Sequence, residues 1–205
     1  MPRDLVLTRF RNIVPGRRGA PVPRGDDDLN PDMRADMAGR KLVQAAVLVP
    51  LVDRPEGMTV LLTKRTDHLH DHAGQISFPG GRLDPEDADA VAAALRETEE
   101  ETGLDRSHID LIGQLDIYVT RTGFEVTPVV GLVRPGFALN PDTFEVAEVF
   151  EVPLAFFLEP GSRRMESREW QGKRRYFYVY PYGSYYIWGA TAGMLNNLAE
   201  VLSAA

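Results

Sequence analysis

Dense apolar runs alternate with turn-forming stretches along most of the chain, and this pattern predicts a sheet-rich protein. Residues 41–50 and 58–64 are two such runs, joined by the turn-like sequence Asp-Arg-Pro-Glu-Gly, so we expect them to form a β-hairpin. Further strands are expected in four later segments: 109–119, 125–133, 145–152 and 174–180.

Two segments have the periodicity of helices. In residues 88–102, apolar side chains and a threonine recur at 3.6-residue spacing along one face. Asp87 is expected to cap the start of this helix, and Gly103 sits where the glycine that follows a helix belongs. Residues 188–202 are expected to form the second helix. Strands on both sides of two helices predict an α/β protein with a mixed β-sheet between helical layers.

The first 40 residues differ from the rest of the chain. They are rich in Arg, Asp, Gly and Pro, and residues 15–31 contain few apolar side chains. We therefore expect an irregular N-terminal arm over residues 1–40, with room for a short helix near 33–37, followed by one domain over residues 41–205. The first 20 residues hold five arginines and no long apolar run, which is unlike a secretory signal.

Composition narrows the classes of function. Apolar residues make up 43% and charged residues 26% of the chain, enough for a substantial core. The net charge of −7 argues against nucleic-acid binding through bulk positive charge, and no apolar run is long enough to cross a membrane. The absence of cysteine excludes disulfides, thiolate catalysis and cysteine metal sites, and it fits a cytoplasmic protein.

An acidic cluster on the first predicted helix carries the candidate chemistry. Glu97, Glu100 and Glu101 are spaced so that they share one helix face, and Arg96 lies four residues before Glu100. Like charges in a cluster repel one another, and a divalent cation would remove that repulsion. Mg²⁺ and Mn²⁺ prefer carboxylate oxygens. The alternative is an ordinary solvated acidic helix face.

The segment from Gly81 to Leu104 resembles the sequence box of the Nudix hydrolases. The second half of the box matches at six positions: Arg96, Glu97, Glu100, Glu101, Gly103 and Leu104. Thr98 replaces the usual apolar residue. The stretch between Gly81 and Arg96 is one residue longer than the general pattern, and the acid of its first half is replaced by Asp87 or Ala88.

The longer box and an upstream motif together resemble one Nudix subfamily, the coenzyme A diphosphatases. The motif is present here as residues 61–66 (LLTKRT), Gly74 and residues 78–81 (FPGG). His70 stands where that subfamily usually has arginine. Residues 145–150 and 187–192 also look like that subfamily, so the resemblance covers about residues 40–202.

The resemblance implies a Nudix-type α/β/α sandwich and a metal-dependent diphosphatase. Its small-molecule substrate would be coenzyme A or an acyl-CoA, cut into 3′,5′-ADP and 4′-(acyl)phosphopantetheine. The implied ligands of Mg²⁺ or Mn²⁺ are Glu97, Glu100 and Glu101, and Arg96 would orient these glutamates. The catalytic base stays open between Glu100 or Glu101 on the helix and Glu145 or Glu148 on a later segment.

Substrate contacts are expected from the upstream motif. Lys64, Arg65 and His70 could meet the phosphate groups, and Gly80 and Gly81 would allow the backbone to approach a ligand closely. Two other functions stay open: a Nudix hydrolase of ADP-ribose, nucleotide sugars or dinucleotides, and a catalytically idle module that binds a nucleotide. A homodimer is allowed by the general frequency of two-fold symmetry.

Overall fold

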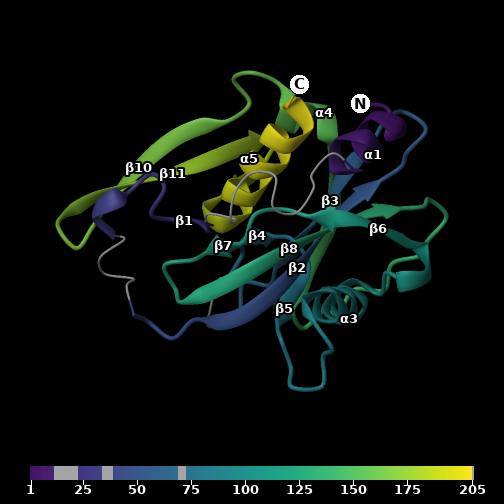
Figure 1. The fold of residues 1–205 in the computed structure, drawn as a ribbon, viewed down its shortest axis with the longest axis horizontal. Coiled ribbons are helices and arrows are strands. Elements are labelled where there is room, and N and C mark those ends of the chain that lie inside the picture. The colour runs from purple at the N-terminus through teal and green to yellow at the C-terminus, as the bar shows by residue number, and fades with distance from the viewer. Residues whose placement is uncertain (12–22, 34–38, 69–72, 205) are drawn as a thin grey trace.

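The computed structural model describes residues 1–11, 23–33, 39–68 and 73–204. Its centre is a nine-stranded mixed sheet, and a smaller sheet of three strands lies beside it (Figure 1). The large sheet contains β1 (Arg24–Gly25), β2 (Val43–Val52), β3 (Thr59–Arg65), β4 (Ile76–Ser77), β5 (Gly80–Arg82), β6 (Ile109–Gln114), β7 (Tyr118–Val119), β8 (Phe124–Val133) and β9 (Val146–Pro153).

Strand β2 is the spine of this sheet because three strands pair with it. It runs parallel to β8 from Val43↔Phe124 to Val52↔Val133. It pairs antiparallel with β3 at its end and with β5 near its middle, so the predicted hairpin is confirmed. Its apolar run reflects burial on both faces.

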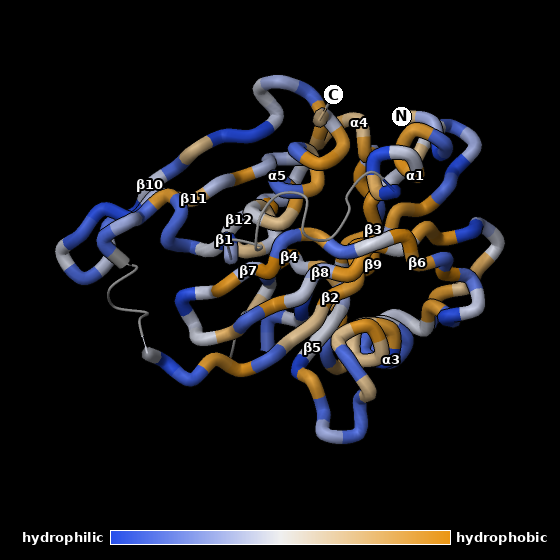
Figure 2. Tube along the Cα trace, viewed as in Figure 1, coloured by the Kyte–Doolittle hydropathy of each residue, from blue (hydrophilic) through white to orange (hydrophobic). Residues whose placement is uncertain are grey.

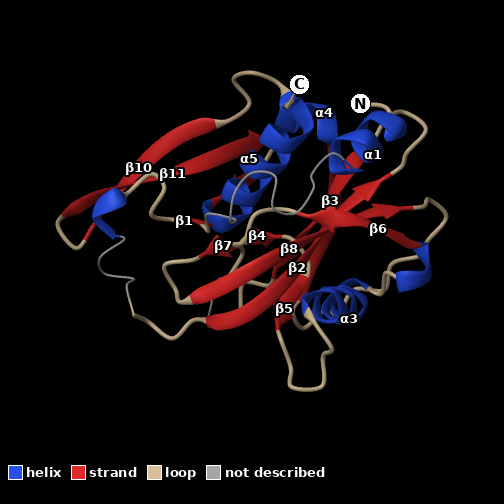
Figure 3. Ribbon diagram, viewed as in Figure 1, coloured by secondary structure: helices blue, strands red, loops and turns tan. Residues whose placement is uncertain are grey.

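Helices cover both faces of the large sheet, which confirms the predicted α/β fold (Figure 3). Helix α3 (Ala90–Thr102) packs Ala93 and Ala94 against Ala46, Leu48 and Val129 on one face. The other face is covered by α5 (Gly189–Ser203), α1 (Arg3–Arg11) and the short α4 (Leu154–Leu158). The apolar segments therefore lie between the layers, as the hydropathy colouring shows (Figure 2).

The smaller sheet was only partly foreseen. It consists of β10 (Arg164–Trp170), β11 (Lys173–Tyr182) and β12 (Tyr185–Trp188), all antiparallel. The aromatic run at 174–180 predicted β11. Strand β10 is charged and mostly exposed, so its sequence carries no core-facing alternation to reveal it.

The start of α3 corrects one prediction. The helix is capped by Asp89, not Asp87: the Asp89 backbone is extended, and its Oδ1 accepts a hydrogen bond from the Ala92 N–H at 2.9 Å. Asp87 is held elsewhere by Arg96. The end of the helix is as predicted, because Gly103 has a left-handed φ of 71°.

The N-terminal arm is not irregular throughout its described part, which is a second correction. Val6 and Phe10 of α1 are buried in the main core, and β1 pairs parallel with β7. Two apolar side chains one helical turn apart suffice to dock a short helix, which the polar composition concealed. Only a 3-10 turn, Pro31–Met33, is described near the expected helix at 33–37; residues 34–38 lie outside the described residues. The division of the chain at residue 40 stays a prediction.

The predicted strand at 109–119 is also corrected, since it is split into β6 and β7. Gly113 adopts a φ of 158° where the pairing of β6 with β8 shifts register. In the described residues, no helix is both long and apolar enough to cross a membrane.

Docking of α1 can be tested by truncating its buried aromatic side chain. We expect Phe10→Ala to lower the free energy of unfolding by about 2–4 kcal/mol, because it leaves a cavity in the main core. Leu5→Ala is the matched control, since Leu5 is exposed on the same helix and should change stability by less than about 0.5 kcal/mol. Denaturant unfolding measures both; equal, small effects would mean that α1 does not belong to the core.

Candidate active site

Helix α3 positions the acidic cluster by packing its opposite, small-residue face against the sheet. Its small residues Ala93 and Ala94 face the sheet, and Thr98 continues this buried face. The Thr98 hydroxyl donates to the Ala94 carbonyl at 2.6 Å, which explains how a polar side chain is tolerated there. The face that carries Glu97 and Glu101 is thereby directed toward β5.

Glu101 is the most buried carboxylate of the cluster, with 8% of the residue exposed. Its Oε2 accepts a hydrogen bond from the Gly80 N–H at 3.1 Å, and Arg65 lies 3.8 Å from its Oε1. Burial raises the pKa of Glu101 to about 7, and the negative charges of Glu97 and Glu145 add to this shift. The surroundings of Glu101 thus bring the pKa of its carboxyl group close to neutral pH.

Glu97 lies against the backbone of Gly81. A Cβ atom at Gly81 would lie 2.5 Å from either carboxylate oxygen of Glu97, so a larger residue here would push this carboxylate aside. Burial raises the pKa of Glu97, and the charges of Glu100 and Glu145 act in the same direction. The Glu100 side chain is 60% exposed and borders the same cluster from the solvent side.

Arg96 links the cluster to the loop before α3. Its Nε and Nη2 donate to the two carboxylate oxygens of Asp87 at 3.0 and 2.8 Å, while Nη1 donates to Glu97 and Glu100 at 3.0 Å each. These hydrogen bonds raise the pKa of Arg96 and hold that of Asp87 below its usual range. Asp87 therefore fixes Arg96 and does not cap the helix. The contacts suit the orienting role predicted for Arg96.

A second arginine, Arg65, connects the cluster with Glu145, which directly precedes β9. Arg65, at the end of β3, lies 3.8 Å from Glu101 and 3.5 Å from Glu145. The adjacent Thr66 holds this segment in place: its N–H donates to the Glu145 carbonyl and its hydroxyl to the Phe144 carbonyl, both at 2.9 Å. No pattern in the sequence pointed to this contact of Thr66.

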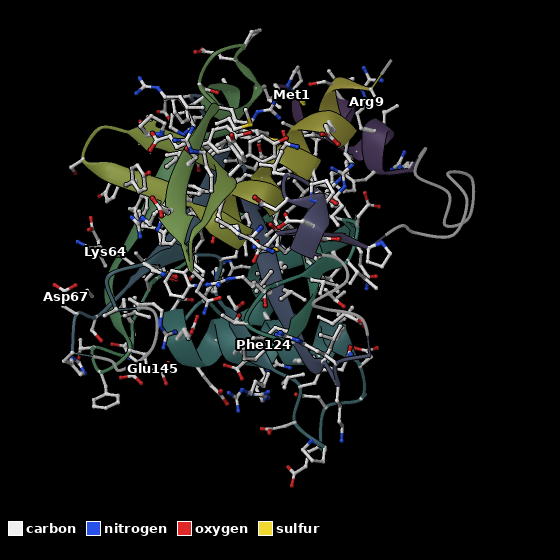
Figure 4. All side chains as sticks on the ribbon, turned by 90° about the vertical axis from the view of Figure 1, so that its left-hand side faces the viewer. Met1, Arg9, Lys64, Asp67, Phe124 and Glu145 are labelled. Carbon is white, nitrogen blue, oxygen red and sulfur yellow. The ribbon has the colours of Figure 1, made fainter. Side chains whose placement is uncertain are left out.

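Lys64 and Glu148 lie on the opposite face of the sheet. They are partners in the β3–β9 register, on the face that packs against α5, whereas Arg65 projects toward α3. The Tyr185 hydroxyl donates to Glu148 at 2.5 Å, and its ring stacks on Phe150. Lys64 and Glu145 nevertheless lie along one edge of the molecule (Figure 4). His70 lies outside the described residues.

The donor chemistry fits a hard divalent cation, although the ligands are not preassembled. Within the described part of the chain, no group of three His, Cys, Asp or Glu side chains is already arranged around a metal position. Arg96 and Gly80 hold the oxygens of Glu97 and Glu101 instead. The candidate ligand atoms of Glu97, Glu100 and Glu101 are all carboxylate oxygens, and such ligands favour Mg²⁺ or Mn²⁺ over softer ions.

The raised pKa of Glu101 predicts how stability depends on pH without metal. Because the fold favours the protonated form, stability should fall as pH rises from about 4.5 through about 7, by roughly 2–3 kcal/mol. Glu101→Gln should remove most of this loss. Denaturant unfolding in a chelator at about pH 5 and pH 8 measures it. Glu99→Gln, which removes an exposed carboxyl paired with Arg106, should keep the wild-type pH dependence. A wild-type stability that does not change with pH would contradict the buried carboxyl.

Comparison with known proteins agrees with this geometry. The chain is 44% identical over 156 residues to the protein called "Uncharacterized Nudix hydrolase NudL" of Escherichia coli (strain K12), a match that spans 76% of this chain and 81% of that protein. A protein of the same name from Cronobacter sakazakii is 43% identical over 171 residues, spanning 83% of this chain and 88% of that protein.

Solved structures support the same fold. The MutT/nudix family protein from Enterococcus faecalis superposes with a TM-score of 0.50 at 17% identity, over 97% of this chain and 73% of that one. The family model of the NUDIX domain matches residues 42–171, which include the whole acidic cluster, both arginines and Glu145. On these matches, the chain belongs to the Nudix hydrolase family, whose enzymes cleave diphosphates.

Proposed function

We propose that this protein hydrolyses the diphosphate bond of coenzyme A or an acyl-CoA, using Mg²⁺ or Mn²⁺, to give 3′,5′-ADP and 4′-(acyl)phosphopantetheine. One observation carries the proposal. Residues of the upstream motif that resembles the coenzyme A diphosphatases contact the carboxylates of α3: Arg65 and Gly80 meet Glu101, and Gly81 meets Glu97. The motif that suggests the substrate thus lies beside the proposed catalytic groups.

Glu97, Glu100 and Glu101 are the proposed cation ligands. They share one face of α3, and burial, together with repulsion among the carboxylates, raises the pKa of Glu97 and of Glu101. A bound Mg²⁺ or Mn²⁺ would supply positive charge that offsets the diphosphate and makes water more acidic. Arg96, anchored by Asp87, would keep Glu97 and Glu100 oriented before the cation and substrate arrive.

Glu145 is the proposed general base. It lies on the α3 side of the sheet, and it is close enough to Glu97 and Glu101 for its charge to raise the pKa of both. Its side chain is partly exposed, so it can accept a proton from a water molecule. Glu148 projects from the other face and is held by Tyr185, which makes it the weaker choice.

Arg65 is the proposed contact for the diphosphate. It is partly exposed between Glu101 and Glu145, where an anionic substrate would come near its guanidinium group. Lys64 lies on the other face at the same edge of the sheet. We assign Lys64 to the 3′-phosphate, which is farther from the bond that is cut, and keep His70 as a candidate phosphate contact on the motif alone.

Substrate identity is tested by incubating the protein and Mg²⁺ or Mn²⁺ with coenzyme A, ADP-ribose, nucleotide sugars and dinucleotides, and separating the products chromatographically. We expect 3′,5′-ADP from coenzyme A, and a rate at least about 100-fold lower for Glu97→Gln. The control Glu99→Gln changes a glutamate of the same helix that pairs with Arg106, and should keep the wild-type rate. Cleavage of another compound alone would refute coenzyme A as the substrate. Binding without turnover would identify a nucleotide-binding module.

The choice of base is tested by a second pair of variants. Glu145→Gln should lower kcat by about 10²–10⁴-fold, because it takes away the proton acceptor. Glu148→Gln should lower kcat by less than about 10-fold, since its carboxylate lies on the other face. The reverse ranking would assign the base to Glu148.

A further inference from the structure

Strand β10 is an open edge. It is the outer strand of the three-stranded sheet and pairs with β11 over seven consecutive residues. Across the four described stretches of chain, no backbone group other than those of β11 bonds to it. The β10–β11 hairpin extends along one side of the molecule, away from α3 (Figure 1). Such an edge is a template for another strand.

Strand β10 carries four charged side chains, but other common protections of an edge strand are missing from it. It contains no proline, no glycine and no lysine, and its ladder with β11 has no bulge. Two of its side chains are large, apolar and exposed: Met165 at 61% and Trp170 at 46%. This strand is therefore regular, long and partly apolar on a surface where proteins normally prevent pairing.

We propose that two copies of this chain form a dimer by antiparallel pairing of their β10 strands around Ser167. The two-fold axis would run perpendicular to the sheet through the Ser167 pair, and two three-stranded sheets would join into one of six strands. Opposite residues would be Arg164 and Trp170, Met165 and Glu169, and Glu166 and Arg168, each pair occurring twice.

The charge pattern selects this register. A two-fold antiparallel pair must be centred on a residue opposite its own copy. Centring on Glu166 would place Glu166 opposite itself and Arg164 opposite Arg168, and centring on Arg168 would place two arginines together. Only the Ser167 register among these three has no like-charge pair, and only it pairs all seven residues. Like charges directly opposite destabilise a sheet, and unlike charges stabilise it.

The remaining charges do not oppose association at the axis. Strand β10 carries two arginines and two glutamates, so it is neutral although the whole chain is not. On the neighbouring β11, Lys173 and Arg175 are paired with Asp32 at 3.3 and 2.8 Å. Arg164 would lie opposite Trp170 of the second copy, whose indole ring already has Arg121 of its own copy 4.6 Å from its centroid.

Charge reversal with compensation tests the proposal, using the full chain in sedimentation velocity and light scattering between about 1 and 100 μM, where weak dimers are populated. The wild type should be a dimer at the higher concentrations. Glu166→Arg or Arg168→Glu alone should raise the dissociation constant at least about 10-fold, since each places like charges opposite one another twice. The double variant should restore the wild-type value.

Restoration separates the dimer contact from contacts within one copy. Glu166 accepts a hydrogen bond from Tyr186, and Arg168 lies over Trp188; the double variant still lacks both. Glu169→Arg is the matched control, because it reverses a charge that would face Met165, and it should leave the dimer intact. A monomeric wild type, or a dimer that the single variants do not weaken, would overturn the proposal.

Discussion

Two adjacent glycines of β5 let this strand lie close to β2 and let carboxylates of helix α3 touch the strand backbone. Gly80 has room for no side chain because a Cβ atom would collide with Ala46 and Val47 of β2. At Gly81, the Glu97 carboxylate occupies the space that a Cβ atom would take. Strand β5 is thus paired closely with the spine of the sheet, and α3 packs against the same spine through Ala93 and Ala94. The position of the acidic cluster follows from this packing.

That close approach has an electrostatic cost. Glu97 and Glu101 are partly or largely removed from water, beside Glu100 and Glu145, and their pKa values rise accordingly. Arg65 and Arg96 offset part of the negative charge, and Asp87 holds Arg96 in place. A site that holds repelling carboxylates together is suited to bind positive charge, and a cation would relieve the repulsion.

The sequence predicted the elements with strong periodicity and missed those without it. The burial of β2 and the face of α3 follow from local pattern, and Gly103 ended the helix where expected. Helix α1 was missed because only Val6 and Phe10 carry its docking, and β10 was missed because its side chains face solvent. Local pattern reports burial, so elements with little burial escape it.

The site shows the same division. The shared face of Glu97, Glu100 and Glu101 follows from helical spacing alone. The clamp between Asp87 and Arg96, and the hold of Thr66 on the Glu145 segment, depend on how distant loops meet. The separation of Lys64 and Arg65 onto opposite faces depends on strand orientation, which the motif by itself does not give. Contacts of this kind require the tertiary structure.

The central claim is that the carboxylates of α3 form a cation site beside the upstream motif. Anomalous diffraction at the manganese edge, from crystals grown with Mn²⁺, tests it directly because it locates the ion without assuming activity. The account predicts a manganese peak within coordination distance of Glu97, Glu100 and Glu101, next to Gly80 and Gly81. Well-diffracting crystals grown with Mn²⁺ that show no manganese peak there, or a peak coordinated by other residues alone, would contradict it.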